Sequence, residues 1–147
     1  MKKDTQATKA SDIKRVWHLI DLKGQTLGRI CSKIANLLMG KSKPYFIRNL
    51  DCGDYVVAIN AKEVKATGNK ELLKKYYYYS GYPGGLRTET LENLRDKNPK
   101  EIIRHAVSGM LPQNRLRDRM FTRLFIFPDA NHSYKDKFSA KGRSASG

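Results

Sequence analysis

Residues 26–40 read TLGRICSKIANLLMG, and their apolar side chains recur at the spacing of one helical face. Thr26 stands where a helix N-cap is expected, and Gly40 stands where helices commonly end in a glycine. The apolar face consists of Leu27, Ile30, Cys31, Ile34, Leu37 and Leu38. The stretch therefore predicts an amphipathic helix that packs one side against a core.

On each side of this helix lies a short apolar run that is rich in strand-forming residues. VWHLIDL at 16–22 precedes the helix, and YVVAIN at 55–60 follows it. Buried strands that alternate with a helix are typical of a parallel sheet, so we expect an α/β fold. RLFIF at 123–127 predicts a last strand.

The second half of the chain carries clear start and stop signals for helices. Residues 72–79 look extended, and a helical segment is expected from about Thr90. Asn98 is followed by a proline and, at position 101, by a glutamate, which together predict a helix start. Pro112 should end that helix, and a short basic helix should follow from about Asn114.

The length of 147 residues is that of one domain. We expect a flexible basic arm over 1–15, a single α/β domain over 16–127 and a loosely ordered polar tail over 128–147.

The charge is strongly unbalanced, because 29 lysines and arginines face 14 acidic residues and give a net charge of +15. Such an excess attracts polyanions through Coulomb forces and counterion release. Nucleic acid is the favoured partner, ahead of an acidic protein or a membrane surface. No apolar run approaches the ~20 residues that a membrane span needs.

Catalytic and metal-binding patterns are absent from the sequence. The chain has no P-loop, dinucleotide-binding, HExxH or GxSxG motif. Its three histidines, His18, His105 and His132, lie far apart. Cys31 and Cys52 form no CxxC pair, which argues against a disulfide framework or zinc site and fits a reducing compartment. We therefore expect no catalytic residue, no cofactor, no metal and no small-molecule substrate.

Basic residues gather where the expected strands and helices end, and loops on a rigid scaffold are suited to binding. Lysine and arginine pair with phosphates, and arginine does so with two donors at once. We predict RNA-phosphate contacts from Lys41, Lys43, Arg48, Lys70, Lys74, Lys75, Arg87, Arg115, Arg117, Arg119 and Arg123.

Residues 74–86, KKYYYYSGYPGGL, raise a separate question. In an extended strand the tyrosines alternate sides, so one pair should cover the core and the other should face solvent. Exposed aromatic rings beside lysines suit irregular RNA, but packing is an equally good reading for any single ring. For the whole loop we favour close approach to an RNA backbone, with Tyr79, Ser80, Tyr82, Gly84 and Gly85 as the contacting residues.

Six motifs in order resemble the L-thirteen family of large-subunit ribosomal proteins over roughly residues 16–132. They are Trp17–Asp21, Thr26–Arg29, Gly40–Pro44, Asp51–Tyr55, Ser80–Gly85 and Val107–Pro112. The resemblance implies a three-layer α/β/α domain around a mainly parallel sheet of about four strands. It also implies RNA-facing stretches at 40–44, 79–85 and 109–119, which add Met110 and Pro112 to the predicted contacts.

The chain departs from the family pattern at two places. Arg117 stands where many members carry a glycine, so a side-chain phosphate contact would replace a close backbone approach. After Phe127 the family's usual glycine and histidine-rich stretch are missing, which leaves the tail contacts open.

The sequence thus predicts a non-catalytic structural constituent of the large ribosomal subunit that binds ribosomal RNA early in assembly, beside neighbouring ribosomal proteins. The expected location is a bacterial-type ribosome in the cytoplasm, with a mitochondrial or plastid ribosome as the alternative. A free RNA-binding translational regulator is the second hypothesis, and a nucleotide-using enzyme is the third.

Overall fold

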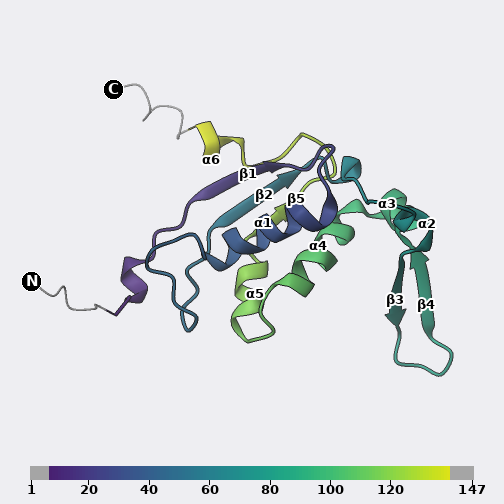
Figure 1. Cartoon of the computed structure of the whole chain (residues 1–147), viewed down its shortest axis with the longest axis horizontal. Coiled ribbons are helices and arrows are strands. Elements are labelled where there is room, and N and C mark those ends of the chain that lie inside the picture. Colours follow the sequence, from purple (N-terminus) through teal and green to yellow (C-terminus); the bar gives the residue numbers. More distant parts are fainter. Residues whose placement is uncertain (1–6, 140–147) are drawn as a thin grey trace, which may run out of the picture.

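A parallel three-stranded sheet forms the centre of the computed structural model, which describes residues 7–139 (Figure 1). Its strands are β1 (Trp17–Asp21), β2 (Tyr55–Ile59) and β5 (Leu124–Ile126), in the order β1-β2-β5. The middle strand β2 pairs in parallel with both neighbours. All three strands were predicted from the sequence, and the α/β class is confirmed.

Helix α1 (Leu27–Met39) covers one face of this sheet and ends as predicted. Gly40 adopts a left-handed conformation with φ of 76°, and its N–H donates to the carbonyl oxygens of Asn36 and Leu37. The Thr26 side chain makes no capping hydrogen bond, although the helix begins directly after it. Ile34 and Leu38 are fully buried, and each such side chain stabilises the fold by about 1.5–3 kcal/mol.

Three further helices follow the order that the sequence predicted. They are α3 (Leu91–Lys97), α4 (Pro99–Met110) and α5 (Leu116–Phe121). Pro99 occupies the first turn of α4, as expected, but the side chain of Asn98 makes no capping hydrogen bond. Helix α4 packs against α1, and both bury their apolar faces in the same core.

The tyrosine run lies in a hairpin that is separate from the central sheet and projects from the body of the molecule (Figure 1). Strands β3 (Lys75–Tyr79) and β4 (Leu86–Thr90) pair with each other in antiparallel fashion. The expectation of about four strands in one sheet is therefore wrong. Charged residues on both strands, such as Lys75 and Arg87, would be buried in a central sheet, whereas the hairpin leaves them in solvent.

The segment before the hairpin also differs from the prediction. Leu72 and Leu73 belong to a helical turn, α2 (Lys70–Leu73), and not to an extended strand. Two short 3₁₀ helices complete the elements before it, η1 (Ala10–Asp12) and η2 (Ala61–Glu63).

The second face of the sheet is covered by aromatic side chains from the C-terminal segment. Trp17 stacks on Tyr55 with 4.4 Å between ring centroids, and Tyr134 and Phe138 pack over it at 5.2 and 6.4 Å. Phe138 lies in the last helix, α6 (Lys135–Ser139), which is a thin third layer. The expectation of a loosely ordered tail is thus wrong for residues 128–139, because their rings cover the sheet. The remainder of that tail lies outside the described residues.

Candidate nucleic-acid interface

Three connecting segments project on the same side of the molecule, the lower side in Figure 1. They are the loop between α1 and β2, the connection between α4 and α5, and the β3–β4 hairpin. These segments contain the three stretches that the family resemblance marked as facing RNA. The C-terminal helix α6 lies on the opposite side (Figure 1).

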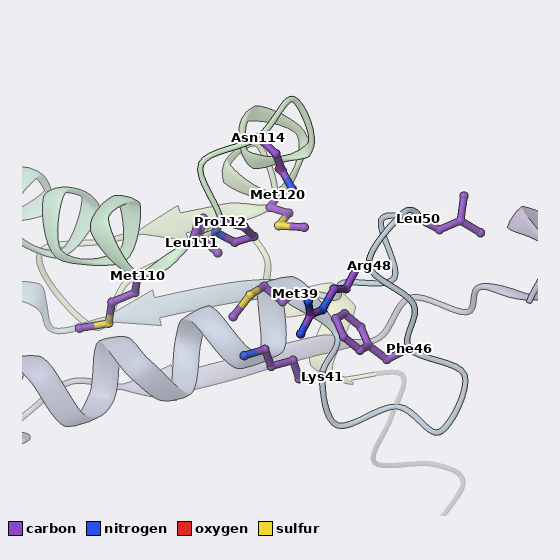
Figure 2. A pocket seen from close by; sticks show the side chains of 10 residues that line it. All are labelled: Met39, Lys41, Phe46, Arg48, Leu50, Met110, Leu111, Pro112, Asn114 and Met120. Carbon is purple, nitrogen blue, oxygen red and sulfur yellow. The ribbon is translucent and has the colours of Figure 1, made fainter.

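A groove of about 390 Å³ lies between the first two segments (Figure 2). Arg48 and Phe46 reach from the loop toward Met39 at the end of α1, and Pro112 and Met120 face them from the α4–α5 side. We call this cavity the methionine groove. It is lined by Met39, Lys41, Phe46, Arg48, Leu50, Met110, Leu111, Pro112, Asn114 and Met120.

The methionine groove brings together four of the predicted contacts, Lys41, Arg48, Met110 and Pro112. The other lining residues were not among the predicted contacts. Met39 is the last residue of one predicted helix, and Met120 lies in another. Their positions in the sequence do not show that these two helices meet at the groove.

A second cavity of about 540 Å³ lies on the other side of Met110, which lines both. Two predicted contacts, Lys70 and Lys74, stand at this cavity together with Lys65. The Lys74 ammonium also lies 5.3 Å from the ring centroid of Tyr76. The other lining residues are Thr26, Leu27, Gly28, Ala66, Thr67, Leu73, Leu91 and Ala106.

The hairpin resolves the question of the four tyrosines. Only Tyr76 is buried, with 4% of its surface exposed, whereas Tyr77, Tyr78 and Tyr79 are 63%, 41% and 69% exposed. The alternation is therefore present, but the hairpin extends past the core before Tyr78 can be covered. Lys75 lies on the exposed side with Tyr77 and Tyr79, and Arg87 lies opposite Tyr78 on the neighbouring strand.

The turn at the end of the hairpin is tight and open to solvent. Gly84 has φ of 69°, and the Gly85 N–H donates to the carbonyl oxygen of Tyr82 at 2.9 Å. A Cβ at Gly85 would lie 2.0 Å from the Ser80 hydroxyl oxygen and 2.9 Å from the Tyr82 carbonyl oxygen, so the turn would have to shift to accept a side chain there. Tyr82 is 75% exposed, which leaves its ring free to contact a partner.

Helix α5 presents the basic cluster that the sequence predicted between Pro112 and the last strand. Arg115 and Arg119 are exposed, and Arg117 is half-buried, with its guanidinium donating to the Gln113 side chain. The three arginines belong to the same segment as Pro112, Asn114 and Met120, which line the methionine groove.

Arg123 lies inside the protein, and the prediction that it contacts RNA phosphates together with the exposed arginines is not supported by this position. It is 6% exposed and pairs with Asp51 through both terminal nitrogens. Its guanidinium also donates to the carbonyl oxygens of Leu38 at 3.1 Å and Asp54 at 3.3 Å. The positive charge of Arg123 is thus neutralised inside the protein. Its side chain connects the α1–β2 loop to the residue just before β5.

Lys43 has a similar position under the same loop. Its ammonium lies 2.5 Å from a carboxylate oxygen of Asp54 and donates to the backbone oxygens of Lys14 and Cys52. With 11% of its side chain exposed, Lys43 holds the loop and presents little charge to the surface. We call Lys43, Asp51, Asp54 and Arg123 the loop clamp.

The N-terminal segment is also attached to the loop clamp. Arg15 donates to the Gly53 carbonyl oxygen at 2.6 Å and lies 3.5 Å from the Asp51 carboxylate. His18 Nε2 lies 2.8 Å from Asp54. A Cβ at Gly53 would lie 1.6 Å from the Leu38 carbonyl oxygen, so only glycine allows this close approach.

The electrostatics of Asp54 follow from these contacts. Burial alone would raise the pKa of Asp54, but hydrogen bonds from Lys43, the Val16 N–H and His18 outweigh it. The pKa of this carboxyl therefore lies below its ordinary value, and Asp54 is held ionised beside its partners.

The described residues offer no alternative metal or thiol site. Within residues 7–139 no three histidine, cysteine or acidic side chains form a group that could hold a metal ion. Burial raises the pKa of the Cys31 thiol to about 12, which makes this cysteine unreactive. None of the helices between Ala7 and Ser139 is long and apolar enough to cross a membrane.

Comparison with known proteins gives one consistent family. The profile described as ribosomal protein L13 matches residues 15–133. A large ribosomal subunit protein uL13 of Dehalococcoides mccartyi strain BAV1 is 50% identical over 131 residues, which is 89% of this chain and 92% of that protein. The proteins of the same name from Clostridioides difficile strain 630 and Aquifex aeolicus strain VF5 are 48% and 44% identical, over 86% and 89% of this chain and 88% and 91% of theirs.

Proposed function

The chain belongs to the ribosomal protein L13 family, and we propose that it is a structural constituent of the large ribosomal subunit that binds ribosomal RNA through its three projecting segments. The observation that carries this proposal is the grouping of exposed cations, open cavities and a solvent-exposed aromatic hairpin on one side of the molecule.

The chemistry of these segments suits folded RNA. Lys41, Arg48 and the arginines of α5 are placed to neutralise phosphates, and the rings of Tyr79 and Tyr82 are placed to stack on exposed bases. Phosphate contacts position a protein without reading sequence, so specificity comes mainly from the shape of the RNA. The protein acts by holding its loops in fixed positions for RNA contact and not by catalysis.

The partners are large-subunit ribosomal RNA and neighbouring ribosomal proteins, and binding occurs early in subunit assembly. The relatives named above come from bacteria, which supports a bacterial-type ribosome in the cytoplasm over a mitochondrial or plastid one. We further propose that residues 16–127 form the RNA-binding domain and that the terminal segments support it.

A sucrose gradient of cell extract, repeated after a high-salt wash, tests the proposal directly. The protein, detected by mass spectrometry, should remain in the large-subunit peak in both runs. A protein that stays at the top of both gradients would contradict the ribosomal role and favour the free translational regulator.

A further inference from the structure

We propose that the methionine groove holds a single unstacked base of the ribosomal RNA, with the flanking phosphates on Lys41 and Arg48. This inference deepens the proposed function, on which it rests, because it assigns one contact of the interface to one nucleotide. The alternatives for the same cavity are a phosphate group alone and a side chain of a protein partner.

The floor of the groove is apolar and formed by largely buried side chains. Met39, Leu111 and Met120 are only 7%, 2% and 4% exposed, yet all three line the cavity. Methionine thioethers are polarisable and contact aromatic rings favourably, so they suit the face of a base. A floor of this kind offers nothing to a bare phosphate.

The rim of the groove is cationic. Lys41 and Arg48 are exposed, and within residues 7–139 neither forms an ion pair with an acidic side chain. Their charges are thus available to the phosphates on either side of an inserted base. The same charges disfavour an inserted basic segment of a protein partner.

Asn114 adds a polar group at the edge of the groove, above Met120 in Figure 2. Its Oδ1 accepts the backbone N–H of Leu116 at 3.1 Å, which fixes the side chain and leaves its NH₂ group as a donor. A base edge presents acceptors that such a donor can bind.

The size of the cavity limits the ligand to something small. Its volume of about 390 Å³ lies at the lower end of the ~300–1,000 Å³ that small-molecule sites occupy. One base fits such a space, whereas an RNA helix does not. The loop that supplies one wall of the groove is also anchored at its far end, because Lys43 binds Asp54 and Arg123 binds Asp51.

The methionines provide a direct measurement. The chain contains four methionines, and Met39, Met110 and Met120 line the groove whereas Met1 is the N-terminal residue. Full-length protein carrying ¹³C-methyl methionine is titrated with hexaadenylate and with an abasic hexamer of equal charge. We expect ring-current shifts of the Met39 and Met120 methyl resonances with hexaadenylate and none with the abasic hexamer.

A pair of double variants separates the rim of the groove from other exposed charges. Lys41→Ala with Arg48→Ala should weaken the binding of both oligonucleotides by a similar factor, about fivefold or more, because the phosphates lose their partners. The matched control, Arg29→Ala with Lys33→Ala, removes two exposed charges that do not line the groove and should leave the Met39 and Met120 shifts in place. A shift confined to Met110 would place the base in the second cavity, which Met110 also lines, and overturn the proposal.

A second measurement uses the protein in its own particle. Large subunits are irradiated at 254 nm, and nucleotide adducts on the protein are located by mass spectrometry. An adduct on Phe46 or on a groove methionine supports the proposal. Adducts confined to other segments, or equal methyl shifts with the abasic hexamer or inorganic phosphate, would overturn it and leave the ribosomal role intact. Absence of the protein from large subunits in the gradient would instead contradict the proposed function itself.

Discussion

Arg123 carries its positive charge at a site almost closed to solvent, with Asp51 as its ionic partner. Replacing it by methionine keeps most of the volume but leaves the Asp51 carboxylate without its main cation. Removal of one partner of a buried pair costs about 3–5 kcal/mol. We expect Arg123→Met to lower the free energy of unfolding by this amount in urea titrations.

The same variant also tests whether Arg123 only stabilises the fold or contacts the RNA directly. Since Arg123 does not reach the surface, its loss should weaken RNA binding without changing the slope of affinity against salt concentration. Arg119→Ala, which removes an exposed charge, should lower that slope by about 1. A fall in slope for Arg123→Met in filter binding would show that this arginine contacts phosphate after all.

Asp54 makes the stability of the protein dependent on pH. Its pKa lies below the ordinary value in the folded protein, so its contribution is complete above the unfolded pKa of about 3.9 and is lost as the pH falls through the folded value. The free energy of unfolding should therefore decrease below about pH 4, and less steeply in Asp54→Asn. Urea titrations at pH 6, 4 and 3 measure this, with Asp96→Asn, an exposed carboxylate on α3, as the control that should match the wild type.

Tyr76 and Tyr79 are matched tests of a buried and an exposed ring in one strand. The Tyr76 hydroxyl is buried and has no hydrogen-bond partner in the described part of the chain, so Tyr76→Phe should stabilise the protein, by up to about 1–3 kcal/mol. Tyr76→Ala should destabilise it by about 3–5 kcal/mol, as expected for a large buried ring.

Tyr79→Ala should leave the unfolding free energy unchanged within about 0.5 kcal/mol, because its ring is exposed. It should weaken RNA binding by about 1–3 kcal/mol if a base stacks on it. Thermal unfolding and filter binding of the three variants measure both effects. Unchanged RNA affinity in Tyr79→Ala would show that this ring is not a stacking platform.

At the residue scale, the sequence shows where cations gather along the chain but not which of them are exposed. Arg119 and Arg123 lie four residues apart and look alike in the sequence, yet one faces solvent and the other pairs with Asp51. That difference depends on Asp51, which is 72 positions away from Arg123, and no local sequence pattern shows that these two residues meet.

Helix α5 should contribute more than any other element to the salt dependence of RNA binding. Arg117 and Arg119 lie in this short helix, and Arg115 is its N-cap residue, so the three arginines place three charges within five positions. Their joint replacement by alanine should lower the salt slope by about 2–3, since each lost phosphate contact removes about 0.7–0.9. The slope is measured by filter binding to large-subunit ribosomal RNA at salt concentrations between about 50 and 200 mM.

The control removes the same charge from another element. Lys23 follows the edge strand β1, and Arg29 and Lys33 lie on α1 beside Leu19 and Asp21 of that strand. All three are exposed, and none belongs to the three projecting segments. Their triple alanine variant should keep most of the wild-type slope. Equal losses in both variants would mean that binding depends on net charge alone.

At the element scale the sequence predicted most of the fold, because α1, α4 and the three central strands have strong apolar periodicity or continuous apolar runs. It did not predict the separate hairpin, because the tyrosines indicate that residues 75–79 form a strand but do not determine which other strand pairs with it. The aromatic cover over Trp17 was also missed, since Tyr134 and Phe138 are isolated rings in a polar segment.

For the molecule as a whole, Trp17 reports whether the C-terminal segment covers the sheet. It is the single tryptophan of the chain and lies under Tyr134 and Phe138. A chain that ends at Asn131 should show red-shifted fluorescence and a lower unfolding free energy, because Trp17 and Phe125 lose their cover. A chain that ends at Ser139 should keep the wild-type emission. Identical spectra for both truncations would show that the segment does not shield the sheet in solution.

The order of the strands also has a consequence for the moment at which the protein becomes able to bind. β5 is the last strand in the sequence, and Arg123 immediately precedes it, yet Arg123 fixes the loop that follows α1. During synthesis at about 5–20 residues per second, the nascent chain therefore carries an unfastened loop until nearly its whole length has emerged. Productive capture of RNA should begin only with an almost complete chain, which prevents unfinished chains from occupying the assembly site.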